Sequence, residues 1–105
     1  MILYDKAITY LERAVKELEE DLPTAGDQIR NAQDIVIDLT SSLDLEGGSN
    51  VAKNLNRIYN FVTKHLTKAN VNHDPQMVRE AIAVLEDLNQ SWKSITNPGD
   101  APVIA

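Results

Sequence analysis

A pair of adjacent glycines, Gly47 and Gly48, precedes a segment that carries basic residues and no acid. A phosphate-binding loop needs such glycines after a strand and a Lys-Ser/Thr pair behind them, and neither feature is present. A calcium loop that began at Asp44 would need a bidentate acid at its twelfth position, where this chain has Leu55. We therefore interpret the two glycines as a chain reversal at the C-terminal end of a helix.

The two histidines, His65 and His73, are the remaining candidates for metal or acid-base chemistry. A di-iron site in a helical bundle needs Glu-x-x-His motifs on inward faces, and this sequence contains none. Two separated imidazoles without further ligands are weak grounds for a zinc site. A catalytic triad is recognised by geometry, which the mere presence of Ser, His and Asp does not supply. The sequence therefore predicts a protein that is not an enzyme and binds no cofactor.

Length and composition favour one helical domain. The chain has 105 residues, of which 43% are hydrophobic and only 5% aromatic, so its core must be built from aliphatic side chains. It has no cysteine, which fits a reducing compartment. We find no secretory leader and no apolar run near the roughly 18 residues that cross a bilayer. These features predict a cytoplasmic protein without membrane insertion.

Apolar residues recur every three or four positions in four segments, which predicts helices over about residues 2–21, 25–44, 50–70 and 75–96. Pro23 and Gly26 end the first segment, and Asp74 before Pro75 is a typical helix start. Short connections predict an all-α fold, an antiparallel up-down-up-down four-helix bundle over residues 1–96, with residues 97–105 as a flexible tail. The expected core stripes are Leu3, Tyr4, Ala7, Leu11, Ala14, Val15 and Leu18; Ile29, Ala32, Val36, Leu39 and Leu43; Val51, Leu55, Ile58, Val62, Leu66 and Ala69; and Val78, Ala81, Leu85, Leu88, Trp92 and Ile95.

Charge is unevenly distributed along the chain. The net charge is -6, but residues 49–73 hold four bases and no acid, and Lys53, Arg57, Lys64 and Lys68 cluster opposite the core stripe of the third helix. This basic face is either a solvated surface or a docking surface. Because the total charge is negative, an acidic protein is a better candidate partner than RNA, and we expect no nucleic-acid binding.

Some apolar residues do not fit the interior of a four-helix bundle. Ile37 and Phe61 lie far from the centres of their own helix stripes, and Ile35, Ile82 and Val84 lie at the flanks. Several exposed apolar residues on adjacent helices form grooves that accept the apolar face of a partner helix. The sequence therefore predicts a binding surface for an amphipathic segment.

Four stretches of the sequence resemble one known family. They are "LYDKAITYLERA", "AQDIVIDLTSSLDLEGGSNVAKNLNRIYNF", "LTKANVNHD" and "LEDLNQSWKSI". Together they resemble the FliS family of flagellin-specific export chaperones, and the likeness extends from Leu3 to Ile95.

The resemblance implies a cytoplasmic helical bundle that holds the disordered C-terminal segment of flagellin. In that family the chaperone prevents premature polymerisation and assists export through the flagellar type III secretion apparatus, whose gate component is FlhA. A flagellin tail laid on the exposed apolar residues would fold as it binds. The alternative is a structural, oligomerising helical bundle with no flagellin client, and an RNA-binding bundle is a third hypothesis.

The resemblance also implies roles for particular residues. Tyr4, Leu55 and Trp92 match family positions, and we expect all three to pack in the core. Asp34, Asn54 and Tyr59 match positions that lie off the core stripe, and they are expected either to pair with a peptide backbone or to cap a helix end. The predicted partner-binding residues are Asp34, Ile35, Ile37, Asp38, Asn54, Tyr59, Phe61 and Ile82.

Two departures from the family pattern affect these expectations. Lys6 stands where family members usually have glycine, and a bulky cation there changes how closely another helix approaches. Family chains also carry some twenty residues upstream of the "LYD" motif, where this sequence has two, Met1 and Ile2. If that arm normally covers the binding groove, its absence leaves apolar surface open, and we expect either self-association as a homodimer or occupation of the groove by a neighbour.

Overall fold

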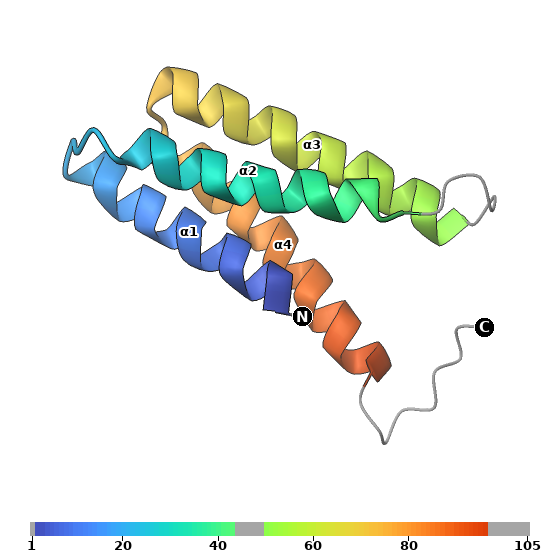
Figure 1. Cartoon of the computed structure of the whole chain (residues 1–105). Coiled ribbons are helices and arrows are strands. Elements are labelled where there is room, and N and C mark those ends of the chain that lie inside the picture. Colours follow the sequence, from blue (N-terminus) through green and yellow to red (C-terminus); the bar gives the residue numbers. More distant parts are fainter. Residues whose placement is uncertain (1, 44–49, 97–105) are drawn as a thin grey trace.

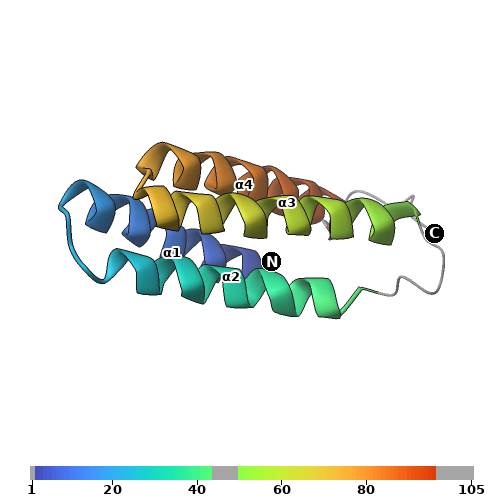
Figure 2. The same ribbon diagram turned by 90° about the horizontal axis from the view of Figure 1, so that it is seen from above.

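The computed structural model describes residues 2–43 and 50–96, with side chains described as far as residue 91. The described residues form four helices, α1 (Ile2–Glu19), α2 (Ala25–Ser41), α3 (Asn50–Asn72) and α4 (Pro75–Thr96). Each helix runs back along its predecessor, as Figures 1 and 2 show. The predicted all-α four-helix bundle is confirmed. The expected tail, residues 97–105, and the two glycines lie outside the described residues.

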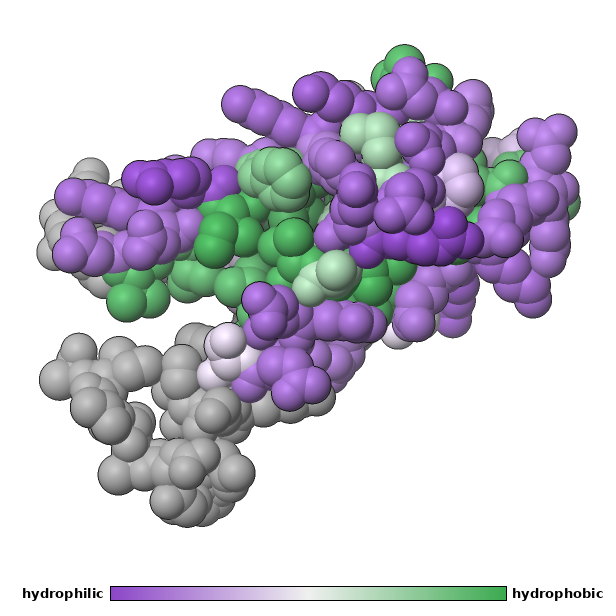
Figure 3. Space-filling model, turned by 180° about the vertical axis from the view of Figure 1, so that it is seen from behind, coloured by the Kyte–Doolittle hydropathy of each residue, from purple (hydrophilic) through white to green (hydrophobic). Residues whose placement is uncertain are grey.

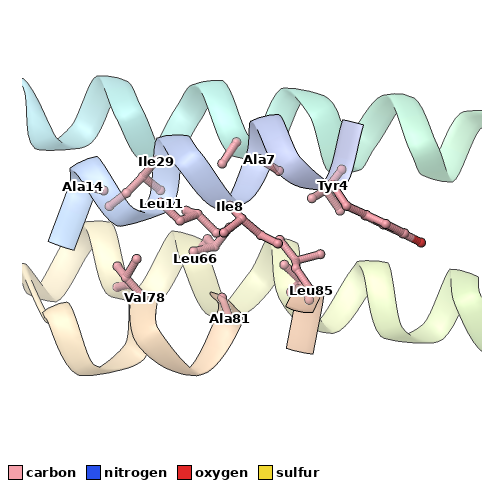
Figure 4. Packing of buried hydrophobic residues seen from close by; sticks show 14 of the residues in the cluster. Tyr4, Ala7, Ile8, Leu11, Ala14, Ile29, Leu66, Val78, Ala81 and Leu85 are labelled. Carbon is pink, nitrogen blue, oxygen red and sulfur yellow. The ribbon is translucent and has the colours of Figure 1, made fainter. Parts of the chain in front are cut away.

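The four helices pack as a closed ring around one core. α1 packs against α2 and α4, and α3 packs against the same two helices, so α1 and α3 face each other across the diagonal. Leu11, Ile29, Leu66 and Leu85, one from each helix, are fully buried. Figure 4 shows these side chains meeting in the interior together with smaller ones such as Ala81. Aliphatic packing supplies most of the stabilisation, as the low aromatic content predicts.

Two of the helices end in the same way. Asp21 after α1 and His73 after α3 both have positive φ, 57° and 50°. At each end two backbone hydrogen bonds close the last turn. The bond that spans more residues runs from the Leu22 N–H to the Glu17 carbonyl after α1, and from the Asp74 N–H to the Ala69 carbonyl after α3. This is a Schellman motif built without glycine. A proline follows two residues later in both cases, and it prevents either helix from continuing.

The helix boundaries differ from the sequence-based expectation at three ends. α1 stops two residues early and α3 continues two residues past Asn70, because the left-handed turn falls at position 21 and at position 73. α2 ends at Ser41, three residues early. The hydroxyls of Thr40, Ser41 and Ser42 donate to the carbonyls of Val36, Ile37 and Leu39, which competes with further helical bonding. The start of α4 is confirmed, since the Gln76 N–H donates to Asp74 Oδ1 at 2.9 Å.

The core stripes are largely confirmed, with three corrections. Leu3 and Val51 were expected inside, but both are exposed, Val51 by 56%. Tyr59 was expected off the core stripe, but it is buried, and its hydroxyl bonds to that of Tyr4. Tyr59 lies beside the stripe, yet its side chain reaches the interior and meets Tyr4 of the diagonal helix α1. Trp92 and Ile95 belong to α4, but their side chains are not among those described.

Candidate partner-binding surface

The bundle is open at the end where α3 begins. Figure 1 shows α2 and α3 running past the N-terminus of α1, while α4 diverges from α3 toward its own C-terminus. Among the described residues, α1 therefore does not extend along the part of α2 and α3 that lies at this end. Figure 3 shows the consequence on the face seen from behind, where apolar side chains gather in a strip that hydrophilic side chains border.

The first half of α3 and the middle of α4 carry five aliphatic side chains that are not fully buried. Leu55 and Ile58 on α3, and Val84 and Leu88 on α4, pack against the core and remain only half-buried. Val51 lies one turn before Leu55 and is exposed. We use "open apolar strip" below for these five residues. Half-buried aliphatic side chains at a widening gap are suited to contact an added apolar helix.

Phe61 extends the strip onto the outer surface of α3. It is 51% exposed, and its ring stacks on the His65 ring at a centroid distance of 5.1 Å. His65 Nε2 lies 2.8 Å from Glu80 Oε1 of α4, so this edge of α3 faces α4. Asn54 is exposed and lies two turns before Phe61 on the same edge. Of the predicted partner-binding residues, Phe61 and Asn54 therefore border the strip.

Ile37 lies on a different edge of the bundle, between α2 and α3. It is 48% exposed and lines a shallow groove together with Asp34 and with Thr63 of α3. Gln33 crosses this groove, since its Nε2 donates to the Thr63 carbonyl and to the Thr67 hydroxyl, both at 2.9 Å. Asp38 is exposed one turn after Asp34 on the outer face of α2. The groove is thus more polar than the open apolar strip.

The other two predicted isoleucines face α1 and are half-buried, as their flanking positions indicated. Ile35 lies two turns from Gln28, whose Nε2 reaches Glu17 of α1. Ile82 lies one turn after Arg79, which pairs with Glu19 of α1. Ile35, Ile37, Phe61 and Ile82 therefore occupy four different edges, and they do not form a single trough.

Tyr59 is in the interior, at the open end of the bundle. Its hydroxyl meets that of Tyr4, with the two rings tilted by 56°. Burial, and secondarily the hydrogen bond with Tyr4, raise the pKa of the Tyr59 hydroxyl above its usual range. Nearby, Asn89 Nδ2 donates to Asp5 Oδ1 at 2.8 Å and links α4 to α1. These two contacts hold the helices in place beside the strip.

Sequence reasoning assigned Val51, Leu55, Ile58 and Leu88 to the core and so missed most of the open apolar strip. All four are on the apolar stripe of their helix, and no sequence signal reports that α4 diverges there. Val84 was expected at the flank of the core, and this placement is confirmed. The exposure of Ile37 and Phe61 was also predicted correctly.

The described residues bring together no group of three metal-binding side chains. Over the same residues, no helix is long and apolar enough to cross a membrane. The arrangement is that of a small helical bundle that leaves several aliphatic side chains partly exposed.

Comparison with known proteins specifies the family. The family model "Flagellar protein FliS" matches residues 1–99, and this chain belongs to the FliS family. The flagellar secretion chaperone FliS of Vibrio cholerae is 36% identical over 75 residues, which is 71% of this chain. The protein of the same name from Salmonella typhimurium is 32% identical over 90% of this chain. The flagellar secretion chaperone FliSB of Pseudomonas aeruginosa is 32% identical over 74%.

Each match covers a smaller share of the relative's length than of this chain. The matched parts make up 55% of the Vibrio cholerae protein, 62% of the Pseudomonas aeruginosa protein and 72% of the Salmonella typhimurium protein. The family and the bundle fold are therefore established, whereas the client and the partners of this chain are matters for proposal.

Proposed function

We propose that this protein is a cytoplasmic flagellar export chaperone that binds the disordered C-terminal segment of flagellin. It would prevent premature polymerisation of the flagellin subunits and assist their delivery to the export apparatus, with FlhA as the receiving gate component. Family membership supports the export role, and the names of the relatives support a secretion chaperone. The open apolar strip is the observation that favours binding of a disordered segment.

The strip has the chemistry that an amphipathic segment needs in order to fold on binding. Its five aliphatic side chains are only partly covered by the bundle, so an added helix would remove them from water. Burial contributes about 25 cal/mol per Å², from which the cost of ordering the segment is subtracted. A moderate net affinity suits a chaperone that releases its client. Phe61 and Asn54, at the border of the strip, would then contact the client.

The test is calorimetric titration with the C-terminal flagellin segment of the same organism, with helicity followed by circular dichroism. We expect binding accompanied by a gain in helix. Val51→Glu and Phe61→Glu should each weaken binding by about tenfold or more, because a carboxylate would be buried against the client. Val71→Glu is the matched control, since Val71 lies on the same helix and is 73% exposed, but is remote from the strip.

Two outcomes would count against the proposal. Absence of both heat and helix gain would leave a structural bundle without a flagellin client as the better description. Equal losses in the Val71→Glu control would show that the strip is not the binding surface. If Val51→Glu or Phe61→Glu loses helical content without peptide, the residue belongs to the core, and the other variant decides.

A further inference from the structure

The outermost face of α3 carries four cations in line, with one aromatic side chain at their centre. We call these five residues the basic row: Lys53, Arg57, Phe61, Lys64 and Lys68. All five are exposed, and at 3.6 residues per turn they lie within about 40° of one line along the helix. Successive members are three or four residues apart, so the row is straight over about 22 Å.

The basic row is unfavourable for α3 itself. Like charges four residues apart destabilise a helix, and the row contains two such pairs, Lys53 with Arg57 and Lys64 with Lys68. Lys53 is also close to the positive end of the helix dipole, where the first turn holds no acid. Among the residues that the structure describes, no acid pairs with any of these four cations. The described part of the bundle therefore leaves this positive charge uncompensated.

Carboxylates border the basic row on both sides. On the α2 side, Asp34 lines the groove between α2 and α3, and Asp38 is exposed one turn later. On the α4 side, Glu80 reaches His65 of α3 at 2.8 Å, and Asp87 is exposed two turns later. A flat anionic membrane or a nucleic-acid duplex on the row would also meet these carboxylates. A single helix, about 10–12 Å across with its side chains, can be seated on α3 alone.

We propose that the basic row binds an acidic amphipathic helix of another protein, laid along α3. One aliphatic side chain of that helix packs on Phe61. Carboxylates one turn to either side of it face Arg57 and Lys64, and carboxylates one turn further out face Lys53 and Lys68. The flanks of the bound helix are neutral or basic, because acidic flanks would be repelled by the carboxylates that border the row.

Phe61 gives the basic row an apolar anchor. It is half exposed and lines a shallow depression with Asn56 and Asn60, whose amides offer both donors and acceptors to a partner. Its ring stacks on His65, so less freedom is lost when a partner covers it. The ion pairs at the row are exposed, so binding is weak and falls with added salt. The inference concerns a partner other than the proposed client and does not depend on that client.

The test uses a synthetic helical peptide that has a central leucine, glutamates one and two turns to either side of it, and neutral flanks. A second peptide has the same composition, with its glutamates distributed around the helix. Fluorescence anisotropy measures the affinity of both, and NMR of the backbone amides locates the contact. The first peptide should bind more tightly than the second by about fivefold or more, and its binding should weaken with salt. The NMR shifts should be confined to the outer face of α3.

Charge reversal separates the basic row from non-specific attraction. Arg57→Glu with Lys64→Glu should weaken binding of the first peptide by about tenfold or more. Lys6→Glu with Arg13→Glu on α1 is the matched control, since each pair of reversals lowers the net charge of -6 by the same four units. This control should bind more tightly than the variant in the row. Val51→Ser removes an apolar contact of the open apolar strip without a change of charge, and it should leave binding of the acidic peptide unaltered.

Circular dichroism checks that the variants fold, and Arg57→Gln with Lys64→Gln replaces the reversal if helix is lost. The proposal is overturned if the wild type does not bind the first peptide or binds both peptides equally. It is also overturned if the α1 control loses as much affinity as the variant in the row, or if the NMR shifts fall on another helix. Tighter binding to anionic vesicles or to single-stranded RNA than to the peptide would overturn it in favour of a polyanion.

Discussion

The hydroxyl of Tyr4 on α1 meets the hydroxyl of Tyr59 on α3 across the diagonal of the bundle. These helices do not pack directly against each other, since each packs against α2 and α4. Both tyrosines are 3% exposed. The pair therefore joins two diagonal helices through their side chains alone, at the end where the bundle opens. Each hydroxyl has the other as its hydrogen-bond partner, and both side chains are buried.

This dependence predicts an asymmetry between single and double substitutions. Tyr59→Phe leaves the Tyr4 hydroxyl buried without a partner and should lower the free energy of unfolding by about 1–3 kcal/mol. Tyr4→Phe should do the same. The double variant removes both hydroxyls and should be more stable than either single variant. Urea denaturation measures all three, and strict additivity of the two losses would contradict the coupling.

The same pair predicts sensitivity to alkaline pH. The pKa of Tyr59 is raised above its ordinary value of 10.0, by burial first and by the Tyr4 hydrogen bond second. Above pH 10 the unfolded chain releases this proton while the folded protein retains it, so the unfolded state binds fewer protons. Stability is therefore full below pH 10 and should fall by about 1.4 kcal/mol per pH unit above it. Tyr59→Phe should make this loss shallower, and an identical slope in both proteins would refute the assignment.

The fold followed from the sequence because the periodic pattern is strong on all four helices. Ile29, Ala32, Val36 and Leu39 show this best, since their spacing alone predicts a buried stripe and all four are buried. The site was only partly predictable. The exposure of Ile37 and Phe61 follows from the angle between each residue and the apolar stripe of its own helix. The exposure of Val51 depends instead on the divergence of α4, which is a relationship between helices that no single stripe encodes.

The ends of the helices were also only partly predictable from the sequence. The proline at position 75 and the Asp74 cap were recognisable, and the structure confirms them. The positive φ at Asp21 and at His73 could not be predicted from a glycine, because neither residue is a glycine. The only signal was a proline two residues later in both places, which marks where a helix must already have ended.

The left-handed turn at His73 predicts a stabilising substitution. A residue with a β-carbon is strained at a φ of 50°, and glycine is not. His73→Gly should therefore raise the free energy of unfolding by about 0.5–1 kcal/mol. Asn72→Gly is the control, since residue 72 is helical and glycine should destabilise it by a similar amount. Thermal unfolding of the two variants should shift in opposite directions.

The link between Asn89 and Asp5 predicts a local loss of order at the open end. Asn89 is buried, and its amide donates to the Asp5 carboxylate. Asn89→Ala should cost about 1–3 kcal/mol and leave the Asp5 carboxylate without this donor. Hydrogen exchange should then accelerate in the first turns of α1 and the second half of α4. Uniform acceleration through all four helices would show that Asn89 supports the whole core instead.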